Sequence, residues 1–231
     1  MPTLIVIDGL DGCGKQTQTS ILRRRLKEAG YNVESISFPD YESLSSGPVR
    51  MYLKGELGDD PEKLSPYLCS EFYAVDRAAQ FYSNWHKKYT GDTVIISDRY
   101  ISANLLYQGA KFSTSEEAKE FFKWMYELEV HKNGIPKEDI TIALTLPIST
   151  SQKLMLKRYN GNKAQMDIHE KNIGFLEKAS STLDLACDYL PTIGYNWVKL
   201  DCSDDNGDVL PMSDISEKIF NLAIETIEHK I

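Results

Sequence analysis

The sequence is poor in the features that mark secreted, membrane-spanning and metal-binding proteins. Its 231 residues include four cysteines, Cys13, Cys69, Cys187 and Cys202, with no C-x-x-C pair and no histidine nearby at metal-binding spacing. A disulfide framework and a zinc site are therefore not indicated, and a reducing cytoplasm is the expected setting. No apolar run reaches the roughly 18 residues of a membrane helix. Since the first residues also lack the pattern of a secretory leader, no membrane partner is expected.

Positive charge is also scarce. Asp and Glu outnumber Lys and Arg by 34 to 26, which gives a formal net charge of -8. Proteins that bind nucleic acid irrespective of sequence carry a basic field, so no nucleic-acid partner is expected. A nucleotide site needs only a local cluster of Arg and Lys and stays compatible with this balance. The length, without repeats or low-complexity linkers, predicts a single domain over residues 1–231.

Short apolar, β-branched segments alternate with helical patterns along the chain. Such runs are typical of strands that are buried on both faces, and their alternation with helices is typical of a parallel sheet. The sequence therefore predicts an α/β fold with a five-stranded parallel sheet and helices on both faces. The predicted strands are Leu4–Ile7, Val33–Phe38, Thr93–Ser97, Ile140–Leu146 and Trp197–Cys202.

Three helices have clear start or stop signals. The first is expected over Lys15–Ala29, ending at Gly30, with its Arg23-Arg24-Arg25 run exposed to solvent. Ser65-Pro66 predicts the start of a long helix that continues to about Tyr89. The last helix should begin near Ser213 or Asp214. The residues expected to face the core are Ile21, Leu22, Leu26 and Ala29 in the first helix and Ile215, Ile219, Leu222, Ala223 and Ile227 in the last.

The strand at the start of the chain runs into a glycine-rich loop and then a helix. Gly9, Gly14 and Lys15 have the G-x-x-x-x-G-K spacing of a phosphate-binding loop, or P-loop. Glycines let successive backbone N–H groups turn toward phosphate oxygens, and the helix N-terminus adds its positive dipole end. Because the motif lies in the required strand–loop–helix context, we expect it to bind phosphate. A tight turn followed by a chance lysine is the alternative.

One position departs from the P-loop pattern. Gln16 stands where a Ser or Thr hydroxyl usually meets Mg²⁺, and Thr17 lies about 100° further round the helix. Metal binding is therefore expected, but the protein ligands of the metal stay open. Cys13, inside the loop, is interpreted as a small residue that fits there.

Asp98 and Arg99 directly follow the third predicted strand. Ligands of open α/β sheets bind at the carboxyl ends of the strands, so this pair should lie beside the P-loop. A carboxylate there can hold Mg²⁺ or its waters, and an arginine can clamp a phosphate. A structural ion pair is the alternative.

Two further groups could bind a nucleotide. Tyr73 and Arg77 share a helix face, where the ring could stack on a base and the guanidinium could reach a phosphate or a base carbonyl. An aromatic core stripe is the alternative. Lys157, Arg158 and Lys163 lie in a polar, glycine-containing stretch that is typical of a mobile lid over phosphates, although a simple exposed loop has the same composition.

In their order and spacing, these motifs resemble those of the thymidylate kinases, P-loop enzymes that phosphorylate dTMP with MgATP. The resemblance runs from residue 4 to about residue 202 and implies the P-loop kinase fold, with a short lid at about residues 157–166. It also implies ATP and Mg²⁺ as cofactors and a homodimer formed through helix faces. The matching motifs are the P-loop with Asp8 in the acidic position, Phe38-Pro39, Asp98-Arg99-Tyr100 with Asn104, Tyr107 and Gln108, and Asp167-Ile168-His169-Glu170.

The resemblance also implies roles for individual residues. Lys15, Asp98, Arg99 and Asp8 would be catalytic, with Asp98 and Asp8 handling the metal. Tyr107 would pack against the deoxyribose, where it leaves no room for a 2′-hydroxyl. The residues implied to bind ATP are Gly9, Asp11, Gly12, Cys13, Gly14, Lys15, Gln16, Thr17 and Arg158. The residues implied to bind dTMP are Asp8, Phe38, Pro39, Tyr73, Arg77, Arg99, Asn104 and Tyr107.

The expected reaction is transfer of the γ-phosphoryl group of ATP to dTMP. Two positions depart from the family pattern. Asp40 and Tyr41 stand where the family often has an arginine after Phe-Pro, and Arg50 could substitute for it. Ala103 stands where a serine is expected before Asn104. Two alternatives stay open. One is a related kinase that acts on a deoxynucleoside or on a different deoxynucleoside monophosphate. The other, which Gln16 alone favours, is a non-catalytic nucleotide-binding module.

Overall fold

The computed structural model describes residues 1–162 and 166–230, and its five strands form one parallel sheet in the order β2-β3-β1-β4-β5. The sheet confirms the predicted architecture, and the strand ends differ from the predicted ones by one or two residues. The strands are β1 (Thr3–Gly9), β2 (Val33–Ser37), β3 (Val94–Asp98), β4 (Ile140–Thr145) and β5 (Trp197–Asp201).

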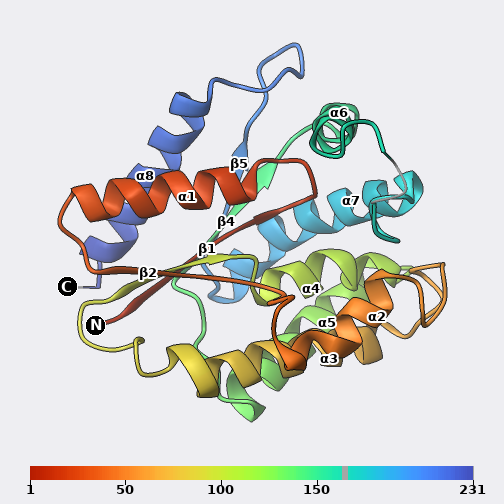
Figure 1. The fold of residues 1–231 in the computed structure, drawn as a ribbon, viewed down its shortest axis with the longest axis horizontal. Helices are drawn as coiled ribbons and strands as arrows, with labels where there is room; N and C mark the ends of the chain where they lie inside the picture. The colour runs from red at the N-terminus through yellow and green to blue at the C-terminus, as the bar shows by residue number, and fades with distance from the viewer. Residues whose placement is uncertain (163–165, 231) are drawn as a thin grey trace.

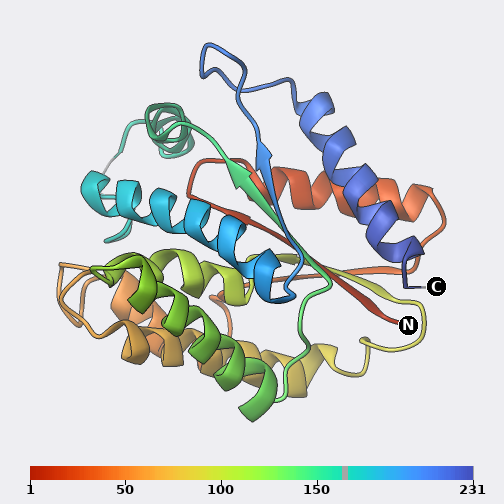
Figure 2. The same cartoon turned by 180° about the vertical axis from the view of Figure 1, so that it is seen from behind.

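Helices cover both faces of the sheet (Figures 1 and 2). On one face lie α1 and α8, and on the other lie α3, α4, α5 and α7. The α-helices are α1 (Lys15–Glu28), α2 (Gly47–Leu53), α3 (Pro66–Gln80), α4 (Ile101–Tyr107), α5 (Ser115–Tyr126), α6 (Ile148–Arg158), α7 (Ile173–Tyr189) and α8 (Met212–Glu228). Short 3₁₀ turns are η1 (Leu44–Ser46), η3 (Gly109–Lys111) and η6 (Leu190–Ile193), and single π-helical turns are η2 (Phe81–Trp85) and η4 (Glu127–Lys132).

The central strand β1 divides the apolar interior into two cores. Leu4 and Val6 point into the core shared with α4, α5 and α7, whereas Ile5 and Ile7 point into the core shared with α1 and α8. This alternation follows from the period of two along a strand. All seven residues of β1 are buried, as expected for a strand covered on both sides, while the edge strand β2 is partly exposed. Since the strands run parallel, all of them end at the same edge of the sheet.

Helix α1 matches the predicted start at Lys15, and Gly30 follows it with a left-handed φ of 92°. Two expectations about its faces were wrong. Ala29 is exposed because it caps the helix rather than lying over the core. Arg25 is not a freely solvated side chain, since it pairs with Glu217 at 2.7 Å and lies over the Phe220 ring, which ties α1 to α8.

The helix that begins at Pro66 is shorter than predicted. Ser65 caps it as expected, but α3 ends at Gln80 instead of continuing to about Tyr89. The wider π-helical turn η2 follows, closed by a hydrogen bond from His86 N to the Phe81 carbonyl at 2.9 Å. This turn places Trp85 in the core, where its side chain is 2% exposed. No helix within residues 1–162 and 166–230 has the length and apolar character needed to cross a membrane.

Candidate functional site

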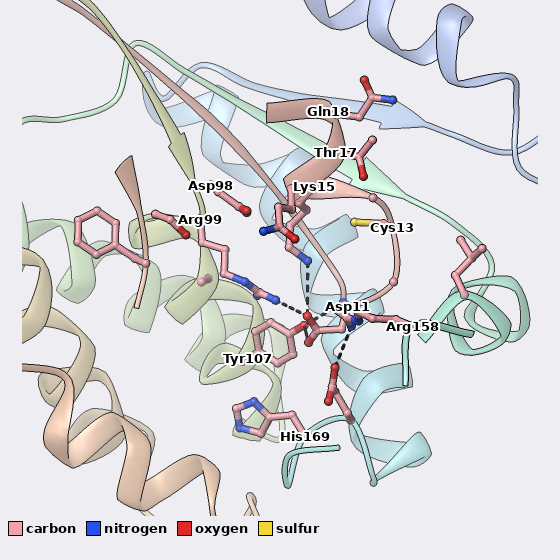
Figure 3. Close-up of a pocket in the computed structure, with 18 of the residues that line it drawn as sticks. Asp11, Cys13, Lys15, Thr17, Gln18, Asp98, Arg99, Tyr107, Arg158 and His169 are labelled. Atoms are coloured by element: carbon pink, nitrogen blue, oxygen red, sulfur yellow. Dashed lines mark hydrogen bonds and ion pairs between the residues drawn. The ribbon is translucent and has the colours of Figure 1, made fainter. Parts of the chain in front are cut away.

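A cavity of about 810 Å³ opens at the edge where the strands end (Figure 3). Loops and helices that follow β1, β2, β3 and β4 line it, so residues far apart in the sequence meet there. Among the described residues, all of the predicted site residues line this cavity except Asp8, Gly9 and the candidate lid cation Lys157. The sheet topology therefore gathers in one place the sites that the sequence suggested separately.

The P-loop forms the floor of the cavity between β1 and α1. Gly9 has a φ of 142°, and a Cβ atom there would lie 2.2 Å from the Leu144 carbonyl oxygen, so no other residue fits. The Lys15 ammonium donates to the Leu10 carbonyl at 2.8 Å and lies 3.6 Å from the Asp11 carboxylate. The lysine is thus held across the loop, at the helix N-terminus, where an anion binds most favourably.

Asp11 is the centre of a charged cluster. Its carboxylate contacts the Arg99 guanidinium and accepts a hydrogen bond from the Tyr107 hydroxyl at 2.6 Å. Burial alone would raise the pKa of Asp11, but the positive charges of Arg99 and Lys15 outweigh it and lower the pKa. Arg99 has a left-handed φ of 66°, an unfavourable conformation for a non-glycine residue that directs its side chain to this cluster. The cluster therefore brings two cations to one carboxylate.

The two other acidic residues differ in accessibility. Asp8 is fully buried, and its two oxygens accept hydrogen bonds from Gly9 N at 2.8 Å and from the Ser102 hydroxyl at 2.5 Å. Asp98 lines the cavity at the end of β3, where burial raises its pKa against the opposing charges of Lys15 and Arg99. A carboxylate beside a phosphate-binding lysine suits the oxygen-rich shell of Mg²⁺, which Asp98 can supply directly or through water.

Aromatic and amide side chains also line the cavity. Tyr73 is 9% exposed, and Asn104 donates to the Ser70 carbonyl at 3.2 Å. Gln108 is 1% exposed, and its amide makes no hydrogen bond of good geometry within the described part of the chain, although the Tyr52 hydroxyl is near enough to interact with it. An amide that is buried without a partner is costly unless a ligand satisfies it. Gln108 had been noted only as part of a motif, and its burial and its lack of a well-formed hydrogen bond could not be seen in the sequence.

The segment after the proposed lid lies against the cavity. Glu170 accepts hydrogen bonds from Arg158 at 3.0 Å and from the Tyr159 hydroxyl at 2.9 Å. His169, which the sequence indicated only as part of the Asp167–Glu170 motif, is buried and lines the cavity. Lys163, the third candidate lid cation, lies outside the described residues.

Six apolar residues also line the cavity. They could not be assigned to the site from the sequence, because apolar positions at the ends of core elements carry no recognisable signal. They are Leu146, Leu154, Val209, Leu210, Met212 and Ile215.

The fold and this site define a class of protein. A parallel sheet whose first strand runs into a P-loop lysine, with a carboxylate and an arginine at the end of an adjacent strand, is the arrangement of the P-loop phosphotransferases. The comparisons with known proteins identify the family: a family model described as thymidylate kinase matches residues 7–190. The chain belongs to the thymidylate kinase family, whose members are ATP-dependent phosphotransferases.

Individual relatives agree with this assignment. The chain is similar to the thymidylate kinase of Mycobacterium tuberculosis, with 32% identity over 165 residues, which is 71% of this chain and 73% of the relative. It is 28% identical over 211 residues to the probable thymidylate kinase 1 of Saccharolobus solfataricus, covering 91% of this chain and 94% of that protein. The similarity therefore extends over almost the whole length.

Proposed function

We propose that this protein transfers the γ-phosphoryl group of ATP to the 5′-phosphate of dTMP, giving ADP and dTDP. The observation that carries this proposal is the position of Asp11 between two cations. Its carboxylate lies 3.6 Å from the Lys15 ammonium and in contact with the Arg99 guanidinium. Lys15 comes from the P-loop after β1 and Arg99 from the end of the neighbouring strand β3, so a donor phosphate and an acceptor phosphate would meet between them.

On the donor side, the P-loop backbone and Lys15 would hold the ATP phosphates, with Gln16 and Thr17 at the start of α1. Asp98 would hold Mg²⁺ directly or through its waters. Asp8 is fully buried and both of its oxygens accept hydrogen bonds, so it would contribute its negative charge from below the cavity floor. When bound, Mg²⁺ supplies positive charge to the phosphate oxygens. Arg158, which is 52% exposed, is close enough to the cavity to act as the lid cation.

On the acceptor side, Arg99 would bind the dTMP phosphate and Tyr73 would stack on the base. Phe38, Pro39, Asn104 and Tyr107 would complete the nucleoside pocket. Gln108 adds a buried amide without a well-formed hydrogen bond, which can both donate to and accept from a base. These groups suit a nucleoside monophosphate better than a small inorganic acceptor.

The acceptor phosphate is already an anion, so the reaction needs no strong general base. Catalysis would come from aligning two polyanions and neutralising the charge that develops on them. Lys15, Arg99 and the lid cation are the groups that do this. Closing the lid would also exclude water and so suppress hydrolysis of ATP.

We also propose a homodimer that functions in the cytoplasm. Leu68 and Val75 of α3, together with Tyr82, lie seven residues apart and form an exposed stripe, with exposed fractions of 42%, 57% and 56%. Apolar residues at this spacing are typical of a helix that packs on another helix. All four cysteines are free thiols, as expected in a reducing compartment.

The test is ADP release with MgATP across a panel of dTMP, dUMP, dCMP, dGMP, AMP and thymidine. A response to dTMP well above the others is expected. A higher response to thymidine or to another monophosphate would support a kinase with a different acceptor. ATP binding without ADP release on the whole panel would instead support the non-catalytic module.

A further inference from the structure

Arg77 is held by an unusually complete set of buried contacts. Its Nε and Nη2 atoms donate to the two carboxylate oxygens of Glu129, both at 2.6 Å. Its Nη1 atom donates to the Tyr100 carbonyl at 3.1 Å. The side chains of Arg77 and Glu129 are 1% and 0% exposed, so this bidentate ion pair is shielded from water. Such a pair fixes the plane of the guanidinium as well as its position.

These contacts leave part of the guanidinium unused. The group has five N–H bonds, of which Glu129 takes two and Tyr100 takes one. One N–H bond therefore remains on each terminal nitrogen. Arg77 lines the same cavity as Tyr73 and Gln108, so a ligand in this cavity is a partner that these two donors can reach.

The charge balance decides what kind of partner suits Arg77. Because the Glu129 carboxylate already compensates the guanidinium, an incoming phosphate would gain little attraction and would meet a buried negative charge behind it. A neutral acceptor such as a ring carbonyl needs only the N–H donors. Arg99, by contrast, is directed to the phosphate-binding cluster around Asp11. The two arginines are thus divided between the base and the phosphate.

The local backbone explains how Glu129 reaches Arg77. Glu129 lies in η4, where the regular helix α5 changes into a π-helical turn, and Asn133 N donates to the Leu128 carbonyl at 2.8 Å. An extra residue in the turn rotates the following side chains relative to a continuous α-helix, and π-turns of this kind occur frequently at functional sites. Neighbouring Glu127 is 52% exposed, so the turn directs one acidic residue inward and leaves another in solvent.

We propose that Glu129 is a positioning residue that sets the selectivity of the acceptor site for the nucleobase. It would hold Arg77 so that the two free N–H bonds meet the carbonyl that thymine and uracil carry where cytosine carries an amino group. An amino group at that place would face the two N–H bonds of Arg77 with N–H bonds of its own, so that the donors of both groups would stay unpaired in a buried site. Mismatches of this kind give the largest discrimination between substrates. This inference rests on the proposed function, because it needs a pyrimidine nucleotide in the acceptor compartment.

The first test is Glu129→Gln, which replaces one acceptor oxygen by an NH₂ group that faces the N–H bonds of Arg77. We expect the KM for dTMP to rise at least about tenfold and the ratio of kcat/KM for dTMP over dCMP to fall at least about tenfold. The KM for ATP should stay unchanged. Glu129→Asp, which keeps the carboxylate, should recover part of the dTMP-to-dCMP ratio. Glu127→Gln, the same change at an exposed position of the same turn, is the matched control and should behave like the unaltered protein.

A second pair of variants covers the case in which Glu129→Gln does not fold. Replacing both partners, Arg77→Leu with Glu129→Leu, leaves no lone buried charge and is the better-tolerated change. It should lose the dTMP-to-dCMP selectivity as completely as Arg77→Leu alone, because Glu129 acts only through Arg77. An unchanged ratio in the double variant, or equal losses toward ATP and dTMP in Glu129→Gln, would overturn the proposal.

Calorimetric binding of dTMP and dCMP separates this inference from the proposed function. If the protein binds dTMP more tightly than dCMP and Glu129→Gln abolishes the difference, the role of Glu129 holds even when no ADP is released. If neither nucleotide binds, the inference fails together with the acceptor assignment. If both bind and the substitution leaves their affinity ratio unchanged, only the inference about Glu129 fails.

Discussion

Tyr107 stacks face to face on His169, with ring centroids 5.0 Å apart and ring planes 9° apart. Figure 3 shows Tyr107 between Arg99 and His169. The His169 ring is fixed in turn by a hydrogen bond between its Nε2 atom and the Tyr52 hydroxyl at 2.8 Å. Burial lowers the pKa of His169 to about 3, so the ring is neutral under physiological conditions. The segment after the proposed lid therefore supports the tyrosine that packs against the sugar in the proposed dTMP complex.

Loss of this support should weaken acceptor binding. In His169→Ala the Tyr107 ring loses its stacking partner, and we expect the KM for dTMP to rise about 2- to 10-fold, in line with the energy of an aromatic pair. Steady-state kinetics measures the change. His169→Phe keeps an aromatic ring at the same place and should retain most of the affinity. Equal KM values for dTMP in His169→Ala and in the unaltered protein would rule out a supporting role.

The same histidine should make stability depend on pH. Its pKa is about 6.5 in the unfolded chain and about 3 in the folded protein, so unfolding takes up a proton between these values. The contribution of His169 is complete above pH 6.5, and the free energy of unfolding should fall as the pH drops toward 3, by up to about 1.4 kcal/mol per pH unit.

His169→Phe should remove this slope, which urea unfolding at several pH values would measure. Asp167, whose pKa is raised to about 7 by burial, gives the opposite slope between about pH 4 and 7. The difference in the free energy of unfolding between His169→Phe and the unaltered protein at each pH isolates the contribution of His169. His131→Phe, at an exposed position, is the control, and a slope that persists in His169→Phe would contradict the assignment.

Lys15→Met should remove the positive charge of the P-loop while keeping much of the side-chain volume. We expect the affinity for ATP to fall and kcat to drop by about 10²-fold or more, since the charge is lost where phosphate charge develops. Calorimetry with ATP and the ADP-release assay measure the two effects. Arg24→Met, on an exposed part of the same helix, should change neither. Full ATP affinity in Lys15→Met would mean that the P-loop does not hold the donor.

Arg99→Ala should separate the acceptor from the donor. Most activity should be lost, by about 10²-fold or more, because the acceptor phosphate loses its cation. ATP binding should survive, since Lys15 and the P-loop backbone are untouched. An equal collapse of ATP affinity would place Arg99 on the donor side.

Val75→Glu should disrupt the proposed dimer. A charge in the middle of the apolar stripe on α3 is unfavourable in a helix–helix interface but harmless at a solvent-exposed surface. Sedimentation velocity should therefore show a dimer for the unaltered chain and a monomer for the variant. Leu44→Glu, at an apolar position that is 95% exposed and outside the stripe, is the control. A monomeric unaltered protein would refute the dimer.

Much of the site could be predicted because its residues follow directly from local rules. Gly9, Gly14 and Lys15 have a fixed spacing between a strand and a helix. Asp98-Arg99 follows another strand, and in any parallel sheet this strand ends at the same edge as the strand before the P-loop. These features depend on neighbours in the sequence, so a sequence reveals them. The end of α3 was harder to predict from the sequence, because the tertiary packing of Trp85 favours a π-helical turn over a continued α-helix.

The sequence by itself determined the strand–loop–helix order, the two apolar faces of β1 and the edge of the sheet at which the proposed phosphate site lies. Only the tertiary structure decided the partners of the charged and polar groups. Glu129 lies 52 residues from Arg77 and His169 lies 62 residues from Tyr107, yet each pair is in direct contact. Such pairings depend on how helices pack across the sheet, and no local pattern encodes them. For the same reason, only the folded chain showed that Arg77 is already neutralised and that the buried Gln108 amide lacks a well-formed hydrogen bond.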